Sequence, residues 1–141
     1  MSSSSAHSFQ SDYADCGTLQ VYAGVDPADQ VAALEAILAE LRRLRDELVP
    51  ADELARARAY VSGRLELRLE EGRHVASWLG VQEALHNRVL TLDEALAELA
   101  AVTPDDIRAL AQRLLRDDAL CLAMITPSRG TLRLERALRL T

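Results

Sequence analysis

Leucine spacing constrains the fold of this chain more than any other feature. Between residues 31 and 48, apolar residues recur at steps of three and four, which predicts one face of an amphipathic helix. These residues are Val31, Leu34, Leu38, Leu41, Leu44 and Leu48. Similar patterns predict helices over residues 51–71 and 73–86, a fourth that begins at the capping-box sequence of residues 91–94, and a fifth over residues 104–114. The chain is therefore rich in helix.

The amino-acid composition indicates which side chains form the core between these helices. Leu and Ala make up about a third of the 141 residues, and aromatic residues only 4%. The core must therefore be aliphatic. One stretch is ambiguous, because Leu65-Glu66-Leu67-Arg68-Leu69-Glu70 also alternates as a strand would. We favour helix, since Leu, Glu and Arg are good helix formers and no turn residue separates this stretch from the preceding helical pattern.

Two other stretches are typical of strands. Residues 18–25 alternate apolar and polar side chains, and residues 119–125 form a continuous apolar run between turn residues. Two strands alone are not a stable sheet, and both would have open edges. The predicted fold class is α+β, with five helices packed on a small β-sheet. We expect this to be a partial domain that is completed by dimerisation.

The chain organisation follows from these patterns. Residues 1–14 are a polar leader and approach segment, residues 15–128 the partial domain, and residues 129–141 a basic tail. The tail carries four Arg and one Glu, whereas the rest carries 12 Arg and 21 acidic residues. Leucines give the tail an apolar side. The tail either docks on an acidic helix face or on a partner subunit, or it frays.

Charge and hydropathy indicate which classes of partner this chain does not have. The net charge is −6, all 16 basic residues are Arg, and no basic cluster lies outside the tail, so we expect no nucleic-acid partner. No apolar run approaches about 18 residues, so we expect no membrane span. No signal peptide is visible, and two cysteines are too few for a disulfide scaffold. These features favour a reducing cytoplasm.

A series of short segments occurs in a recognisable order. It begins at Asp15-Cys16-Gly17-Thr18-Leu19-Gln20 and includes Val49-Pro50-Ala51-Asp52-Glu53-Leu54, Leu79-Gly80-Val81-Gln82-Glu83-Ala84-Leu85 and Val102-Thr103-Pro104-Asp105-Asp106-Ile107. It closes with the apolar run and Pro127. In this order and spacing the chain resembles the insulinase/pitrilysin family of zinc metallopeptidases, which includes the mitochondrial processing peptidase subunits. About 120 residues take part in the resemblance.

The resemblance is to the C-terminal part of one homology domain, which in the family follows a strand–helix–strand portion. The family's His-x-x-Glu-His zinc motif belongs to that upstream portion and is absent from this sequence, where His7, His74 and His86 never lie four apart. The resemblance therefore implies a fragment that does not cleave peptides by the family mechanism. Neither metal ligands nor substrate-contacting residues of the family can be carried over to this chain.

Two Glu-x-x-His patterns are the candidate metal ligands. Glu71 with His74, and Glu83 with His86, place a carboxylate and an imidazole on one helix face, and Glu70 is a further neighbour. The simpler interpretation is surface helix charge, because Gly72 interrupts the first pair and the pairs are twelve residues apart. We expect no cofactor, with zinc or another divalent metal as the alternative.

The cysteines and the tryptophan have competing interpretations as well. Cys16, at the start of the first predicted strand, is the candidate nucleophile, although a reactive thiolate needs a base or a positive environment. Cys121 is expected to be a core residue. Trp78 lies at helical spacing with Val75 and Leu79, which favours a packing anchor over a ligand platform.

Two functional hypotheses remain. The first is a non-peptidase fragment with a structural or self-associating role, which forms a homodimer. The alternative is a small stand-alone hydrolase, for esters or phosphoesters, in which a dimer interface assembles a His/Glu metal site or places Cys16 as nucleophile. Whether the chain is an enzyme is therefore open at this level.

Overall fold

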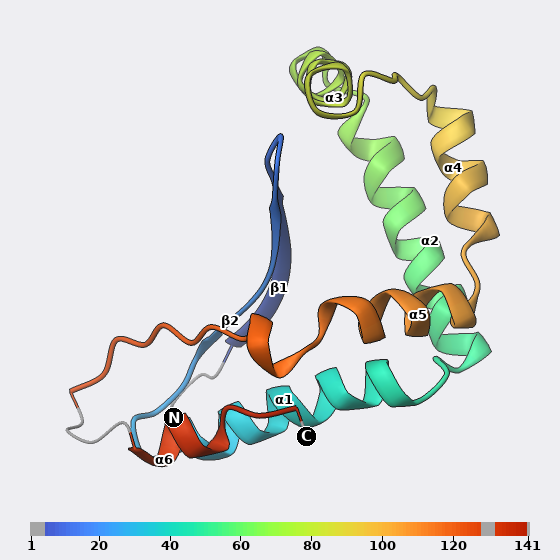
Figure 1. Ribbon diagram of the computed structural model, residues 1–141. Coiled ribbons are helices and arrows are strands. Elements are labelled where there is room, and N and C mark those ends of the chain that lie inside the picture. The colour runs from blue at the N-terminus through green and yellow to red at the C-terminus, as the bar shows by residue number, and fades with distance from the viewer. Residues whose placement is uncertain (1–4, 128–131, 141) are drawn as a thin grey trace. The chain divides into compact units, whose positions relative to one another are not determined.

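The computed structural model describes residues 5–127 and 132–140, without the side chain of Leu132 (Figure 1). The chain begins with two strands, β1 (Ser5–Asp12) and β2 (Gly17–Gly24), which pair as a hairpin in one two-stranded sheet. The helices follow: α1 (Gln30–Asp46), α2 (Ala51–Arg68), α3 (Gly72–His86), α4 (Leu92–Ala101), α5 (Pro104–Leu114), a 3-10 turn η1 (Asp117–Ala119) and α6 (Leu132–Ala137). The α+β class is thus confirmed.

The five predicted helices are present close to their predicted bounds. The ambiguous stretch after Gly63 is helical as far as Arg68, so α2 ends about three residues earlier than predicted. Caps explain several of the boundaries. The Thr91 hydroxyl accepts the Glu94 N–H, and the Glu94 carboxylate accepts the Thr91 N–H, which together form the capping box of α4.

The first correction concerns the polar approach segment. Residues 5–12, predicted to be an irregular approach, form strand β1 and pair with β2. The turn between the strands is closed by the Tyr13 N–H, which donates to the Cys16 carbonyl at 2.9 Å. The His7 ring lies 5.9 Å from the Phe9 ring and 5.1 Å from the Tyr22 ring. The first contact lies within β1 and the second crosses to β2, and together they stabilise a strand whose own sequence is mostly polar. Residues 1–4 of the predicted leader lie outside the described residues.

The second correction concerns the apolar run at residues 119–125, which is not a buried strand. Ala119 ends the 3-10 turn, and residues 120–127 have neither helical nor strand hydrogen bonding. Leu122, Met124 and Ile125 are exposed. The run has the composition of a strand, but a strand needs a partner, and the one described sheet contains only β1 and β2.

The chain divides into two compact units. The first comprises Met1–Gln10, Leu19–Leu48 and Ile107–Thr141, and the second comprises Ser11–Thr18 and Val49–Asp106. In the first unit α6 packs on α1, and the core is a leucine cluster: Leu34, Leu38, Leu134 and Leu140. This cluster confirms the aliphatic core expected from composition. Leu44 and Leu48 continue the predicted stripe of α1 but are exposed.

In the second unit α2 and α4 lie side by side (Figure 1). Leu54 of α2 is buried, and the Arg58 guanidinium donates to the Val102 carbonyl at the end of α4. That contact ties the middle of α2 to the C-terminal end of its neighbour. Among the described residues, no helix combines the length and the apolar composition needed to cross a membrane.

Candidate functional site

The first Glu-x-x-His pattern lies at the start of α3. The Nδ1 atom of His74 is 3.2 Å from a carboxylate oxygen of Glu71, and the other oxygen of Glu71 is 3.3 Å from the Nε atom of Arg73. Glu71 is the N-cap residue of α3, and Glu70 beside it is exposed. The Glu71 carboxylate therefore already contacts the side chains of Arg73 and His74, as expected for polar residues on a helix surface.

The second pattern lies at the opposite end of the same helix. Glu83 and His86 occupy the last turn of α3, and both are exposed. Twelve residues separate His74 from His86, which on a helix is about 18 Å. Zinc bonds to imidazole nitrogen are only about 2.0–2.1 Å long. Hence one chain does not bring the two histidines to one ion. In residues 5–127 and 132–140, no three His, Cys, Asp or Glu side chains are grouped to hold a metal.

The two cysteines lie in different units, and both are exposed. Cys16 closes the β1–β2 turn through its carbonyl, and its thiol is free and exposed. Cys121 lies in the irregular segment after η1, so the expectation of a core cysteine was wrong. That expectation assumed a buried strand at 119–125, and the strand is absent. Trp78 is half-buried, as a packing residue would be. Neither proposed hydrolase centre assembles within the described part of one chain.

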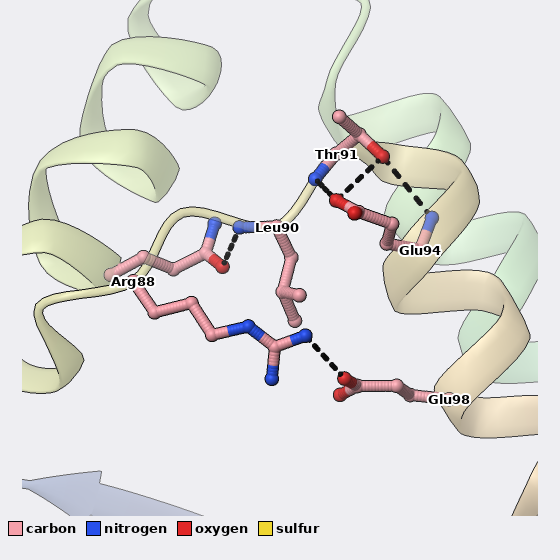
Figure 2. Close-up of polar contacts among 6 residues, drawn as sticks. Arg88, Leu90, Thr91, Glu94 and Glu98 are labelled. Carbon is pink, nitrogen blue, oxygen red and sulfur yellow. Dashed lines mark hydrogen bonds and ion pairs between the residues drawn. The ribbon is translucent and has the colours of Figure 1, made fainter.

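The connection between α3 and α4 holds a group of polar contacts (Figure 2). Gln82 of α3 is 8% exposed, and its side-chain oxygen accepts the Leu90 N–H at 3.0 Å. Arg88 donates to Glu98 of α4 at 3.0 Å. Asn87 ends α3 in the left-handed conformation, with φ 49°. These contacts fix how the chain leaves α3 and enters α4, so we assign them a structural role.

Sequence reasoning did not foresee the hydrogen-bond partner of Gln82. The Gln82 amide spans an eight-residue separation to a backbone N–H, and no short sequence pattern marks such a bond. The side-chain nitrogen of Gln82 is buried without a hydrogen-bond partner among the described residues.

Exposed apolar side chains gather on the hairpin. Phe9, Leu19, Val21 and Tyr22 expose 43%, 55%, 38% and 57% of their surface. Two of these four residues are aromatic, in a chain with 4% aromatic residues. Such a concentration of apolar surface on a two-stranded sheet is typical of an association surface.

The segment after η1 exposes a second apolar surface in the same unit. Leu122, Met124 and Ile125 expose 40%, 38% and 105% of their surface. Leu120, just before them, has extended backbone with φ −76° and ψ 129°. Within the described residues, no hydrogen bond holds Cys121–Ile125 to another segment. This segment therefore has both the composition of a strand and free backbone groups to pair.

The tail of the chain packs on α1 of the same unit through apolar side chains. Leu134 and Leu140 are 4% and 0% exposed, against Leu34 and Leu38 of α1. Residues 132–140 thus pack on α1 of their own chain, and they do so through leucines rather than on the acidic helix face named among the alternatives. Residues 129–131 and 141 of the predicted tail lie outside the described residues. Sequence reasoning foresaw the apolar side of the tail but not its target.

Known proteins match this chain in sequence. The family model described as the Peptidase M16 inactive domain matches residues 3–61. An "Uncharacterized zinc protease" of Streptomyces coelicolor is 34% identical over 111 residues, which cover 79% of this chain and 24% of that protein. The "Uncharacterized zinc protease YmxG" of Bacillus subtilis is 35% identical over 125 residues, which cover 88% of this chain and 30% of that protein.

More distant matches agree with these. The mitochondrial-processing peptidase subunit beta of Bos taurus is 28% identical over 124 residues, or 86% of this chain and 25% of that subunit. A chain of the solved structure titled "Complex III2 from Candida albicans, Inz-5 bound" superposes with a TM-score of 0.72 at 23% identity, over 79% of this chain and 27% of that chain. This last likeness is one of fold. The chain thus spans about a quarter to a third of the length of the relatives it matches.

Proposed function

Since this chain is part of one domain of the M16 peptidase family, the insulinase/pitrilysin family, we propose that it serves as a non-catalytic, self-associating structural unit. Three sequence findings support a non-catalytic role. The matching family model is described as an inactive domain. The sequence has no His-x-x-Glu-His motif. Its two Glu-x-x-His patterns, at Glu71/His74 and Glu83/His86, are twelve residues apart.

A single observation carries the self-associating part of the proposal: strand-forming sequence is left without a strand partner. The run at residues 119–125 is apolar, lacks backbone pairing to other described residues, and exposes Leu122, Met124 and Ile125. The β1–β2 hairpin is also uncovered, with every residue of β1 except Ser11 exposed. Unpaired edges and exposed apolar surface are normally covered in a stable protein.

A second copy of the chain supplies the missing surface. It presents the same unpaired segment and the same hairpin, so a contact across a two-fold axis satisfies both copies at once. A total buried area of roughly 1,000 Å² or more would make such a contact specific. We propose a homodimer in which residues 119–125 of each copy pair with the same segment or with the hairpin of the other copy.

Sedimentation equilibrium at micromolar concentration tests this proposal. We expect the mass of two chains. Ile125→Glu should weaken the dimer about tenfold or more, equivalent to about 1.4 kcal/mol, because a two-fold interface receives the introduced charge twice. Leu67→Glu is the matched control, since Leu67 is 67% exposed on α2 in the other unit. We expect that control to keep the dimer.

Two results would contradict the proposal. One is a monomeric mass accompanied by a single cooperative unfolding transition, because a single chain would then close its own core. The other is a dimer that Ile125→Glu and Leu67→Glu weaken equally, because the run at 119–125 would then have no special part in association.

A further inference from the structure

The face of α1 in the first unit accepts a leucine-bearing segment, and the tail provides it. Leu34 and Leu38 lie one helical turn apart on that face and are 7% and 2% exposed. Leu134 and Leu140 complete the cluster from the tail. Two of the four buried leucines of this core therefore come from residues 132–140.

Polar contacts fix the register of the tail on this face. The Arg42 guanidinium of α1 donates to the Arg139 carbonyl at 3.2 Å. The Leu140 N–H donates to the carboxylate of Asp117, the first residue of η1. Both bonds involve the backbone of the tail. Together with the leucine contacts, they therefore fix which tail residues lie against α1 and η1.

A connection of eleven residues lies between Leu120 and the start of α6. Residues 121–127 are irregular, and all of them except Thr126 are exposed. Within the described residues, no hydrogen bond fastens Cys121–Ile125. Twelve residue steps separate Leu120, which packs against the core, from Leu132, and an extended chain of that length spans up to about 40 Å. The connection can therefore deliver the tail to a neighbouring copy.

We propose that two copies of the chain exchange their tails, so that residues 132–140 of each copy bind α1 of the other. This inference rests on the proposed self-association and gives it a defined contact. Exchange reuses the contacts of the closed chain, so it needs no new complementary surface. It also brings residues 129–141, of net charge +3, to residues 1–128, of net charge −9, which favours the encounter of two copies that are otherwise alike in charge.

Cross-linking between two variants tests the exchange. Arg42→Cys and Arg139→Cys are made separately in the full chain with Cys16→Ser and Cys121→Ser, one of them isotope-labelled. The two are mixed, unfolded, refolded together and treated with a short bis-maleimide reagent. Mass spectrometry should then find residue 42 of one isotope linked to residue 139 of the other. Both substitutions remove polar surface groups and leave the leucine cluster intact, so the fold should be retained.

Arg43→Cys mixed with Arg139→Cys is the matched control. Arg43 is next to Arg42 but binds Glu40 at 3.1 Å, so its link to residue 139 should be several-fold less abundant. The double variant Arg42→Cys/Arg139→Cys, diluted alone, reports the link within one chain. If that internal link forms and the mixed pair gives no more than the control, tail exchange is wrong.

Sedimentation separates the two proposals. A dimer without the 42–139 link between copies contradicts the exchange but keeps the proposed self-association. A monomer with only the internal link contradicts both.

Discussion

Leu140 is the most buried side chain of the first unit, although it is the next-to-last residue of the chain. Its exposed fraction is 0%, and it packs with Leu34, Leu38 and Leu134. We expect Leu140→Ala to lower the free energy of unfolding by about 2–5 kcal/mol, through lost burial and a residual cavity. Urea unfolding followed by circular dichroism measures this change.

Leu122→Ala is the matched control for this substitution. Leu122 is 40% exposed in the irregular segment, so the same chemical change should stay within about 0.5 kcal/mol in the monomer. Equal unfolding midpoints for the two variants would mean that the tail does not hold the core together.

The His and Glu residues lead to a prediction about metal. His74 lies near Glu71 at the start of α3, and His86 lies at its end, so the residues of one chain do not converge on one ion. We expect an equimolar addition of Zn²⁺ to leave the thermal unfolding midpoint unchanged. Elemental analysis of the purified protein gives an independent readout. Bound zinc that is lost in His74→Ala and His86→Ala would instead establish a site between chains.

At the scale of elements, the caps of α4 and α5 make stability depend on pH. The backbone N–H of Thr91, and then its hydroxyl, lower the pKa of Glu94 below its ordinary value of 4.5. The hydroxyl of Thr103, and then its backbone N–H, lower the pKa of Asp106 below 3.8. In both caps the folded state favours the carboxylate, and protonation weakens the cap.

The direction of the pH effect follows from these shifts. A lowered pKa contributes stability that is fully present above the ordinary pKa and is lost as the pH falls through the lowered value. We therefore expect the unfolding midpoint of the wild type to fall below about pH 4.5 more steeply than that of Glu94→Gln/Asp106→Asn. Urea titrations across this range measure the two slopes.

A further variant, Thr91→Ala, tests the cap of α4 at neutral pH. Thr91→Ala removes the hydroxyl that binds the Glu94 N–H, and an N-cap substitution of this kind costs about 1 kcal/mol at neutral pH. Parallel pH profiles for the wild type and the Gln/Asn variant would show that the two carboxylates do not carry the acid sensitivity.

Helical elements were also the part of the fold that sequence reasoning predicted well. Every predicted helix is present, because leucine spacing and cap residues act within a few positions of one another. The strands were predicted less well. β1 was missed because its sequence is mostly polar, and its stability depends on ring contacts with β2, such as His7 with Tyr22.

At the scale of the whole molecule, the family relationship and the α+β class were predictable, and the site was not. Short segments in a fixed order, such as the one at Val102–Ile107, suffice for the resemblance, and the chain in the Candida albicans structure shares the fold. The candidate residues Cys16, His74 and His86 were chosen by residue type and spacing. The structure separates them, because two are at opposite ends of α3 and the third is in the hairpin turn.

Sequence alone thus determined the helices of this protein, their caps, the aliphatic nature of its core and its family. Tertiary structure decided which apolar segments find partners. Residues 119–125 and the tail are both rich in apolar side chains, yet the first is exposed and the second is buried on α1. The reason is physical: a helix satisfies its backbone hydrogen bonds within itself, whereas a strand or a docked tail depends on a distant surface that only the folded chain or a second copy presents.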